Sequence, residues 1–202
     1  MLKFTNNKQY DCLKQETRKE EIIRVAAKLF KEKGYSAVTM RDLAAEMGIK
    51  AASLYNHINS KQAILNTIII SLAEEFTAGM KLIQSSEEDC IGKLKQIIEL
   101  HVRISSQNIY GMASLNNDWM HLLEKLDYYQ KLRIDYENDF IAILKQGIAA
   151  GKITNVKPDV MMFSILTTLR SLYIWIPKKE DLELENLSNT LNQILIKGIY
   201  TK

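Results

Sequence analysis

The sequence predicts an all-α fold, and three observations support this. The 202 residues include only 2 Pro and 8 Gly, which is little punctuation for a strand-rich fold with many tight turns. Apolar residues recur at helical spacing along most of the chain, and no useful stretch shows the alternation of a strand. Apolar residues make up 47% and charged residues 25%, as is ordinary for a soluble globular protein.

The first helices are marked by caps and stops. A capping box of Thr17 and Glu20 predicts a helix over 17–33, with Gly34 as its stop. A short second helix is expected from Thr39 to Gly48, a third piece over 50–57, and a fourth helix capped by Ser60. Residues 1–16 are polar and are expected to form an arm.

The later helices are predicted from apolar periodicity. A polar run at 84–89 separates the fourth helix from the next, and 106–118 is expected to form short helical turns. One long helix, or two in series, is expected over 122–150. Residues 158–176 carry apolar side chains on two faces, so this helix must be covered on two sides. A final helix is expected over about 182–197.

Charge and cysteine usage suggest a cytoplasmic protein with a basic end. Residues 1–61 hold 12 Lys and Arg against 7 Asp and Glu, whereas 62–202 hold 15 against 17. A basic end is typical of nucleic-acid binding, although many surfaces vary this much. Cys12 and Cys90 have no metal-ligand spacing and are interpreted as reduced thiols, so no metal is expected.

Neither a signal peptide nor a membrane span is expected. The N-terminus carries charges and no apolar core segment. The best candidate for a span, 160–176, is shorter than the roughly 20 residues that cross a bilayer, and Arg170 interrupts it. A buried helix is the better interpretation.

Residues 39–58 have the spacing of a helix-turn-helix. Ala44 is small where two helices would cross, Gly48 permits a left-handed turn, and Ile49 and Leu54 would anchor the second helix in the core. The exposed face of that helix is small at its start and polar or aromatic further on. Such a face can enter the major groove of DNA and contact phosphates and bases.

Residues 17–66 resemble the tetracycline-repressor family. The resemblance rests on Leu29-Phe30 with Gly34-Tyr35, Thr39 through Ala44, Met47-Gly48-Ile49, Leu54-Tyr55 and Ser60-Lys61. It implies a DNA-binding domain over 17–62, a connecting helix to about 82, and an effector-binding and dimerisation domain over 83–202. As a joint pattern this is far more specific than a helix-turn-helix alone.

The resemblance also implies the DNA-binding residues. Thr39 corresponds to a helix cap that also touches a phosphate, and Tyr55 and Lys61 to two contacts with the DNA backbone. The expected set is Thr39, Arg41, Lys50, Ala51, Ala52, Ser53, Tyr55, Asn56, His57 and Lys61. Many members have Gly at Ala52, an aromatic at His57, Phe at Ile58 and Pro at Asn59, so the operator sequence cannot be predicted.

Dimerisation and effector binding are implied for the C-terminal half. One face of 158–176 would cover a partner, together with the final helix; a thick monomer core is the alternative. The expected interface is Met162, Leu166, Leu169, Tyr173, Leu187, Leu191, Ile194 and Leu195.

An effector site is implied by the resemblance and by no motif. Its candidate residues are His101, Met112, Trp119, Met120, Tyr136, Phe140, Met161 and Trp175. Met and aromatic residues at helical spacing are more often plain core. Arg103, Arg133 and Arg170 lie in neighbouring segments and could orient a polar group or be structural. The expected effector is small and largely apolar, and an anionic one is among the alternatives.

The sequence thus predicts a homodimeric, ligand-responsive repressor that binds a palindromic operator through 50–57. An architectural or cell-division protein on the same fold is one alternative, and an activator is another. An enzyme is disfavoured because the sequence has no Gly-rich phosphate loop and its three His residues are scattered. No cofactor is expected.

Overall fold

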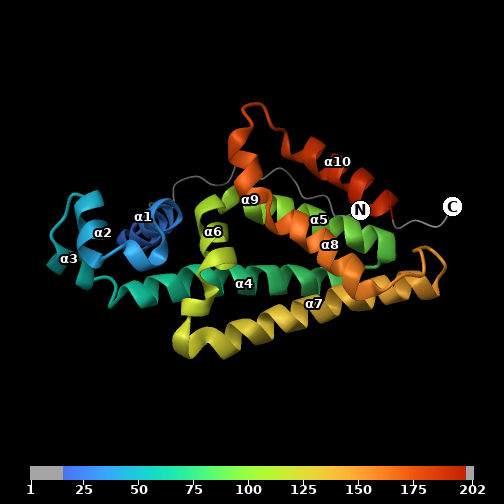
Figure 1. Ribbon diagram of the computed structural model, residues 1–202, viewed down its shortest axis with the longest axis horizontal. Coiled ribbons are helices and arrows are strands. Elements are labelled where there is room, and N and C mark those ends of the chain that lie inside the picture. The colour runs from blue at the N-terminus through green and yellow to red at the C-terminus, as the bar shows by residue number, and fades with distance from the viewer. Residues whose placement is uncertain (1–15, 199–202) are drawn as a thin grey trace.

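The computed structural model describes residues 16–198, which form an elongated bundle of ten α-helices and four short 3-10 helices without a strand (Figure 1). The predicted all-α fold is confirmed. Cys12 and all of the predicted polar arm except Glu16 lie outside the described residues, while Cys90 is a buried free thiol.

The N-terminal helices begin close to where their caps predict. They are α1 (Arg18–Lys33), η1 (Tyr35–Ala37), α2 (Met40–Glu46), α3 (Ala51–Tyr55) and α4 (Lys61–Ser85). Thr17 and Thr39 each form a complete capping box, and the Ser60 hydroxyl accepts from the Ala63 amide at 3.0 Å. These side chains satisfy backbone N–H groups that a helix start leaves without a helical partner.

The C-terminal part is longer and more interrupted. It comprises α5 (Cys90–Gln107), α6 (Ile109–Asn117), η2 (Trp119–His121), η3 (Leu123–Lys125), α7 (Leu126–Ala149), α8 (Pro158–Arg170), α9 (Leu172–Trp175), η4 (Ile176–Lys178) and α10 (Leu184–Lys197). Two expectations for this part were wrong. Residues 109–117 form a regular helix rather than short turns, and the helix expected over 158–176 breaks at Ser171.

Tertiary packing explains both differences. Met112 and Ala113 of α6 are buried, and Gly111 allows α6 to approach Leu72 of α4, where a Cβ atom would lie 2.9 Å from a Leu72 methyl group. This packing supports a helix that its sequence alone does not predict strongly. At Ser171 the backbone amide bonds to the Thr168 carbonyl, so the helical ladder tightens locally and the chain changes direction.

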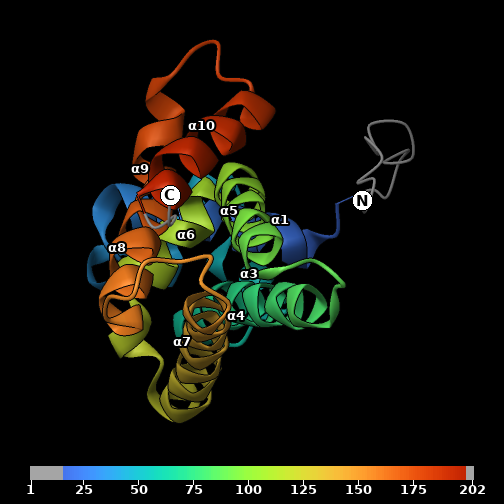
Figure 2. The ribbon, with the colours of Figure 1, turned by 90° about the vertical axis from the view of Figure 1, so that its right-hand side faces the viewer.

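The helix α4 is the central element. It packs against α1, α5, α6 and α7, and α6 also packs against α1, so the N-terminal helices rest on the C-terminal bundle. In Figure 2, α4 and α7 lie side by side while α8, α9 and α10 lie on other sides of the bundle. The α2–α3 pair projects at one end of the molecule (Figure 1).

Two helical segments, Lys61–Ser85 and Pro158–Lys178, are long and apolar enough to cross a membrane by length and composition. This is weak evidence for a span, because core helices of soluble proteins meet the same criteria. Within residues 16–198, no group of three His, Cys, Asp or Glu side chains is placed to hold a metal ion.

Candidate DNA-binding surface and effector cavity

The turn between α2 and α3 sets the orientation of the recognition helix. Gly48 has a φ of 65°, a left-handed conformation that glycine adopts without steric cost. The Ile49 amide then bonds to the Ala44 carbonyl at 3.0 Å, which closes α2. Leu54 is fully buried and is the buried residue of α3, so it anchors this short helix to the core.

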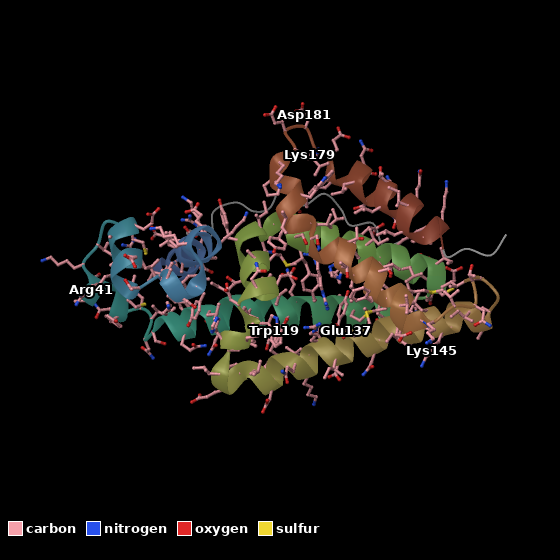
Figure 3. All side chains as sticks on the ribbon, viewed as in Figure 1. Arg41, Trp119, Glu137, Lys145, Lys179 and Asp181 are labelled. Carbon is pink, nitrogen blue, oxygen red and sulfur yellow. The ribbon has the colours of Figure 1, made fainter. Side chains whose placement is uncertain are left out.

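The opposite face of α3 is accessible. Lys50, Ala52, Tyr55, Asn56 and His57 are exposed, and Ala51 and Ser53 are partly exposed. Arg41 of α2 is exposed beside them and points away from the body of the molecule (Figure 3). The structure therefore brings these eight sequence-predicted residues together on one free end.

Thr39 caps α2 as expected, but its donors are engaged internally. Its amide and hydroxyl both donate to Asp42 Oδ2, at 2.8 and 2.6 Å, and its hydroxyl oxygen accepts from the Asp42 amide. The hydrogen bonds from Thr39 also hold the pKa of the Asp42 carboxyl below its usual value. Thr39 thus positions α2, and a phosphate contact from its side chain would require this capping box to open.

Lys61 is likewise more internal than expected. Its ammonium donates to the Tyr35 and Val38 carbonyls, both at 2.8 Å, and lies 4.3 Å from the centre of the Tyr35 ring. These contacts tie the start of α4 to η1, directly before α2. Because an ammonium has one more donor than these two acceptors use, Lys61 combines a structural role with at most one phosphate contact.

We expect Lys61→Ala to reduce both stability and DNA binding. Removing the ammonium leaves two carbonyls without their partner, at a cost of about 1–3 kcal/mol in the free energy of unfolding. If Lys61 also contacts a phosphate, the slope of log affinity against log salt falls by about one. Lys50→Ala is the control, because exposed Lys50 should change the salt slope alone. Urea unfolding with DNA titrations at several salt concentrations measures both effects.

A cavity of about 210 Å³ lies between α4, α5, α6, α7 and α8. It is lined by Ala73, Phe76, Thr77, His101, Met112, Leu115, Asn116, Trp119, Tyr129, Leu132, Arg133, Tyr136 and Arg170. Figure 3 places Trp119 in the middle of the molecule, where η2 meets α4 and α7. The walls combine aromatic and aliphatic side chains with a few polar groups, as is usual for small-molecule sites.

His101 and Tyr136 form a buried polar pair at this cavity. His101 Nε2 and the Tyr136 hydroxyl are 2.9 Å apart, and the Phe76 ring lies 4.6 Å from the His101 ring. His101 Nδ1 is buried without a hydrogen-bond partner. Burial, reinforced by the charge of Arg170, lowers the pKa of His101 to about 3, so the imidazole is neutral at pH 7. Burial raises the pKa of Tyr136, which stays a phenol.

Two arginines of the lining share one carboxylate. Glu137 Oε1 accepts from Arg133 Nε at 3.0 Å and from Arg170 Nη2 at 2.9 Å. Burial alone would raise the pKa of Glu137, but the hydrogen bonds from Arg170 and Arg133 outweigh it and lower the pKa. The Arg133 guanidinium also lies 5.8 Å from the centre of the Trp119 ring. The cavity thus combines charged groups with aromatic, aliphatic and neutral polar side chains.

Half of the predicted effector residues line this cavity: His101, Met112, Trp119 and Tyr136. The other four do not. Met120 and Trp175 are 63% and 42% exposed, whereas Phe140 and Met161 are buried in the core. Those four residues recur at the same apolar spacing as the residues that line the cavity. Spacing alone does not tell whether a residue faces the cavity, the core or solvent.

Sequence reasoning missed Phe76 and Tyr129 and left Arg133 and Arg170 undecided. A signal for part of this set exists. Tyr129, Arg133 and Tyr136 recur at intervals of four and three residues, which places a polar-aromatic stripe on one face of α7. Phe76 gives no such signal, because it is one of several apolar residues of α4.

The buried His101 should make folding sensitive to acid. Between pH 6.5 and about 3, the unfolded chain binds a proton at this residue and the native protein does not. The free energy of unfolding therefore falls as pH drops through this range. We expect the free energy of unfolding of His101→Gln, measured with urea from pH 7 to pH 4, to fall less steeply than that of the parent. The exposed variant His57→Gln should keep the steep dependence of the parent, and an unchanged His101→Gln profile would contradict this assignment.

Most predicted dimer residues lie in the core of a single chain. Leu166, Leu169, Tyr173, Leu187 and Leu191 are each less than 10% exposed, and Met162 and Leu195 are partly buried. Ile194, at 65%, is the predicted residue that is freely exposed. The two apolar stripes of α8 are adjacent and together form one broad inward face, so Leu166 and Leu169 pack within the chain, and the predicted interface stays a prediction.

A different face of α8 and α9 is unpartnered within the chain. Val160, Phe163 and Ile174 are 54%, 67% and 48% exposed. Four exposed hydroxyl residues lie among them: Ser164, Thr167, Thr168 and Ser171. Each of the four hydroxyls donates to the carbonyl four residues earlier, at 2.8–3.3 Å. Because these hydroxyls are satisfied internally, the face can be buried with little loss of hydrogen bonds to water.

Comparison with known families decides the identity of the fold. Residues 22–68 match the model for bacterial regulatory proteins of the tetR family, and residues 87–199 match a tetracyclin repressor-like C-terminal domain. The chain belongs to the TetR family. It is a transcriptional regulator with a helix-turn-helix for DNA, and such regulators are in general not enzymes.

Individual relatives agree with this assignment. The chain is 26% identical over 136 residues to the transcriptional repressor KstR2 of Rhodococcus jostii, which covers 66% of this chain and 67% of that protein. It is 28% identical over 101 residues to the nucleoid occlusion factor SlmA of Shewanella pealeana, covering 50% and 51%.

Solved structures share the whole fold. The ketosteroid transcriptional regulator KstR2 of Mycobacterium tuberculosis superimposes with a TM-score of 0.87 at 20% identity, covering 93% of this chain and 97% of that one. AibR, in complex with isovaleryl coenzyme A and operator DNA, superimposes with a TM-score of 0.72 at 20% identity, covering 88% and 97%. At these identities the likeness concerns the fold.

Proposed function

We propose that this TetR-family regulator is a cytoplasmic homodimeric repressor that binds a palindromic operator and is released by a small, largely apolar effector. The observation that carries the DNA-binding part is the accessible face of α3, held outward by buried Leu54 at one end of the molecule. We assign 17–62 to DNA binding and 83–202 to effector binding and dimerisation. Arg41, Lys50 and Tyr55 supply contacts to phosphates, and the base-facing set is Ala51, Ala52, Ser53, Asn56 and His57.

The exposed face of α8 and α9 is the proposed dimer interface. Val160, Phe163 and Thr167 recur at intervals of three and four residues, so they form one stripe on α8, and exposed Ile174 lies on α9 beyond the break at Ser171. A twofold axis beside this stripe would pack it against itself. Two protomers related in this way can present recognition helices to successive major grooves, which lie about 34 Å apart.

A hydrogen-bonded bridge connects the effector cavity to the DNA-binding helices. Gln62 donates from Nε2 to the His121 carbonyl at 2.6 Å and accepts from the Tyr35 hydroxyl at 3.0 Å. The Tyr35 and His121 rings also lie 5.2 Å apart. Trp119, which lines the cavity, belongs to the same 3-10 helix as His121. A ligand that displaces Trp119 would therefore act on η1 and the start of α4.

The relatives support this proposal by their described activities. KstR2 is a transcriptional repressor, and AibR forms a complex with an acyl coenzyme A and operator DNA. An effector shifts DNA binding only as far as its affinity differs between the two states of the protein. In the free protein, the spacing between the two recognition helices would fit the operator. The ligand would favour a different spacing.

Selection of bound DNA from a random pool tests the proposal. The purified protein should enrich a palindrome and bind it as a dimer, with affinity that falls steeply as salt rises. A protein that stays monomeric and binds no duplex at low ionic strength would refute it.

The relationship to SlmA supports one alternative, a nucleoid or cell-division role on the same fold. Such a protein would occupy many scattered chromosomal sites, whereas a repressor would occupy a few promoters. Mapping of occupied sites across the genome separates the two functions.

A further inference from the structure

The charged side of the effector cavity carries an excess positive charge. Arg133 and Arg170 share the single carboxylate of Glu137, so these three side chains have a formal charge of +1. Both arginines line the cavity. Their side chains are 39% and 32% exposed, which leaves them accessible to an entering ligand. A partly desolvated cation of this kind attracts an anion more strongly than a fully exposed one.

Both guanidiniums retain hydrogen-bonding capacity. Glu137 engages one nitrogen of each, Nε of Arg133 and Nη2 of Arg170, and both groups donate to the same oxygen. A guanidinium presents several N–H groups in a planar fork, which matches the two oxygens of a carboxylate. The side of the cavity formed by Arg133 and Arg170 can therefore accept a carboxylate without releasing Glu137.

The rest of the cavity suits a compact apolar body. Phe76, Met112, Trp119 and Leu132 provide aromatic and aliphatic walls. The volume of about 210 Å³ lies below the usual range for drug-sized ligands. A compact ligand therefore suits it better than an extended one.

One ring nitrogen of the cavity-lining His101 has no hydrogen-bond partner within the protein. His101 is 3% exposed, and its Nδ1 has no partner although Nε2 is paired with Tyr136. A buried polar atom left without a partner is uncommon in folded proteins. This nitrogen is covered in the structure, so a ligand reaches it only after the wall shifts; a hydroxyl could then pair with it in either tautomer, whereas a carbonyl could only accept from a protonated Nδ1.

We propose that the effector is a small apolar carboxylic acid whose carboxylate binds Arg133 and Arg170 and whose body fills the space beside Phe76 and Trp119. This rests on the proposed function, since it names the ligand class of the same site. The single negative charge offsets the excess charge of the arginine pair.

Fluorescence of Trp119 tests this proposal. The chain has two tryptophans, so Trp175→Phe leaves Trp119 as the reporter in the cavity wall. Phenylacetate and hexanoate are titrated beside their uncharged amides, phenylacetamide and hexanamide. Each acid should bind at least about 10-fold more tightly than its amide, because each pair differs mainly in charge and the amide cannot pair with the arginines as an anion.

A second variant assigns the preference to the arginine pair. Arg170→Gln should weaken acid binding about 10-fold and change amide binding less than about 2-fold. Arg170 is preferred over Arg133 for this test because Arg133 also contacts the Trp119 reporter. Arg103→Gln is the matched control, since Arg103 pairs with Glu75 and does not line the cavity. It should leave all affinities unchanged.

Three results would overturn the assignment: amides binding as tightly as acids, Arg170→Gln weakening both equally, or neither acid binding. Isovaleryl coenzyme A is titrated as well. If it binds and neither free acid does, the proposal that the effector carries a free carboxylate is also overturned. Operator affinity without ligand is measured on the same preparations. Intact operator binding with no acid preference refutes the ligand class alone, whereas absent operator binding refutes the proposed function.

Discussion

Phe163→Glu is expected to convert the proposed dimer to monomers. Phe163 is 67% exposed at the middle of the α8 stripe, and twofold symmetry would bury it in both protomers. Burial of one Phe side chain contributes about 1.5–3 kcal/mol, so losing two costs about 3–6 kcal/mol. That corresponds to roughly two to four orders of magnitude in the dimerisation constant. Burying two like charges beside each other adds to the loss.

Sedimentation and operator titration measure this effect. Operator affinity should fall with dimerisation, because a monomer contacts one half-site. Leu82→Glu is the matched control: Leu82 is 71% exposed on α4 and should leave the dimer intact. A Phe163→Glu protein that remains dimeric would show that another surface, such as that around Ile194, holds the protomers together.

Leu54→Ala is expected to abolish operator binding while leaving the effector domain folded. Leu54 is 0% exposed, and truncating a buried Leu to Ala costs about 2–5 kcal/mol. Because α3 has only five residues and Leu54 is its buried residue, this loss falls on the docking of the recognition helix. The equilibrium constant for docking of α3 should fall by about 1.5 to 3.5 orders of magnitude.

Two measurements separate local from global damage. Ligand titration and sedimentation of Leu54→Ala should match the parent, and amide exchange should quicken in α2 and α3 and not in α5 or α7. Leu82→Ala, the same change at an exposed Leu, should alter stability by less than about 0.5 kcal/mol. Unaltered operator affinity of Leu54→Ala would mean that α3 is held by other contacts.

The DNA-binding part was predictable because its signals are local. The caps at Thr17, Thr39 and Ser60 and the turn at Gly48 each lie within a few residues of the structure they determine. Leu54 was identified as an anchor from spacing alone, and it is buried. Lys61 shows the limit of this reasoning: its carbonyl partners at Tyr35 and Val38 lie more than 20 residues away and depend on how α4 meets η1.

The effector cavity and the exposed face of α8 depend on tertiary arrangement. Glu137 and Arg170 are 33 residues apart, and His101 and Tyr136 are 35 apart, so no local pattern predicts that they meet. The inward face of α8 is broader than one apolar stripe because α5 and α7 both pack against it. Periodicity identified the apolar residues of this helix and gave no information on which neighbours would cover them.

The unbroken length of α4 has a mechanical consequence for the operator. Phe76 lies in the cavity wall, and Lys61 stands 15 residues earlier, about 22 Å along the helix axis at 1.5 Å per residue. A tilt of about 5° at Phe76 would swing that end by about 2 Å. In a twofold pair the two displacements add, so the distance between the two recognition helices could change by up to about 4 Å. The DNA grooves would follow such a change only at a cost in deformation energy, which lowers operator affinity.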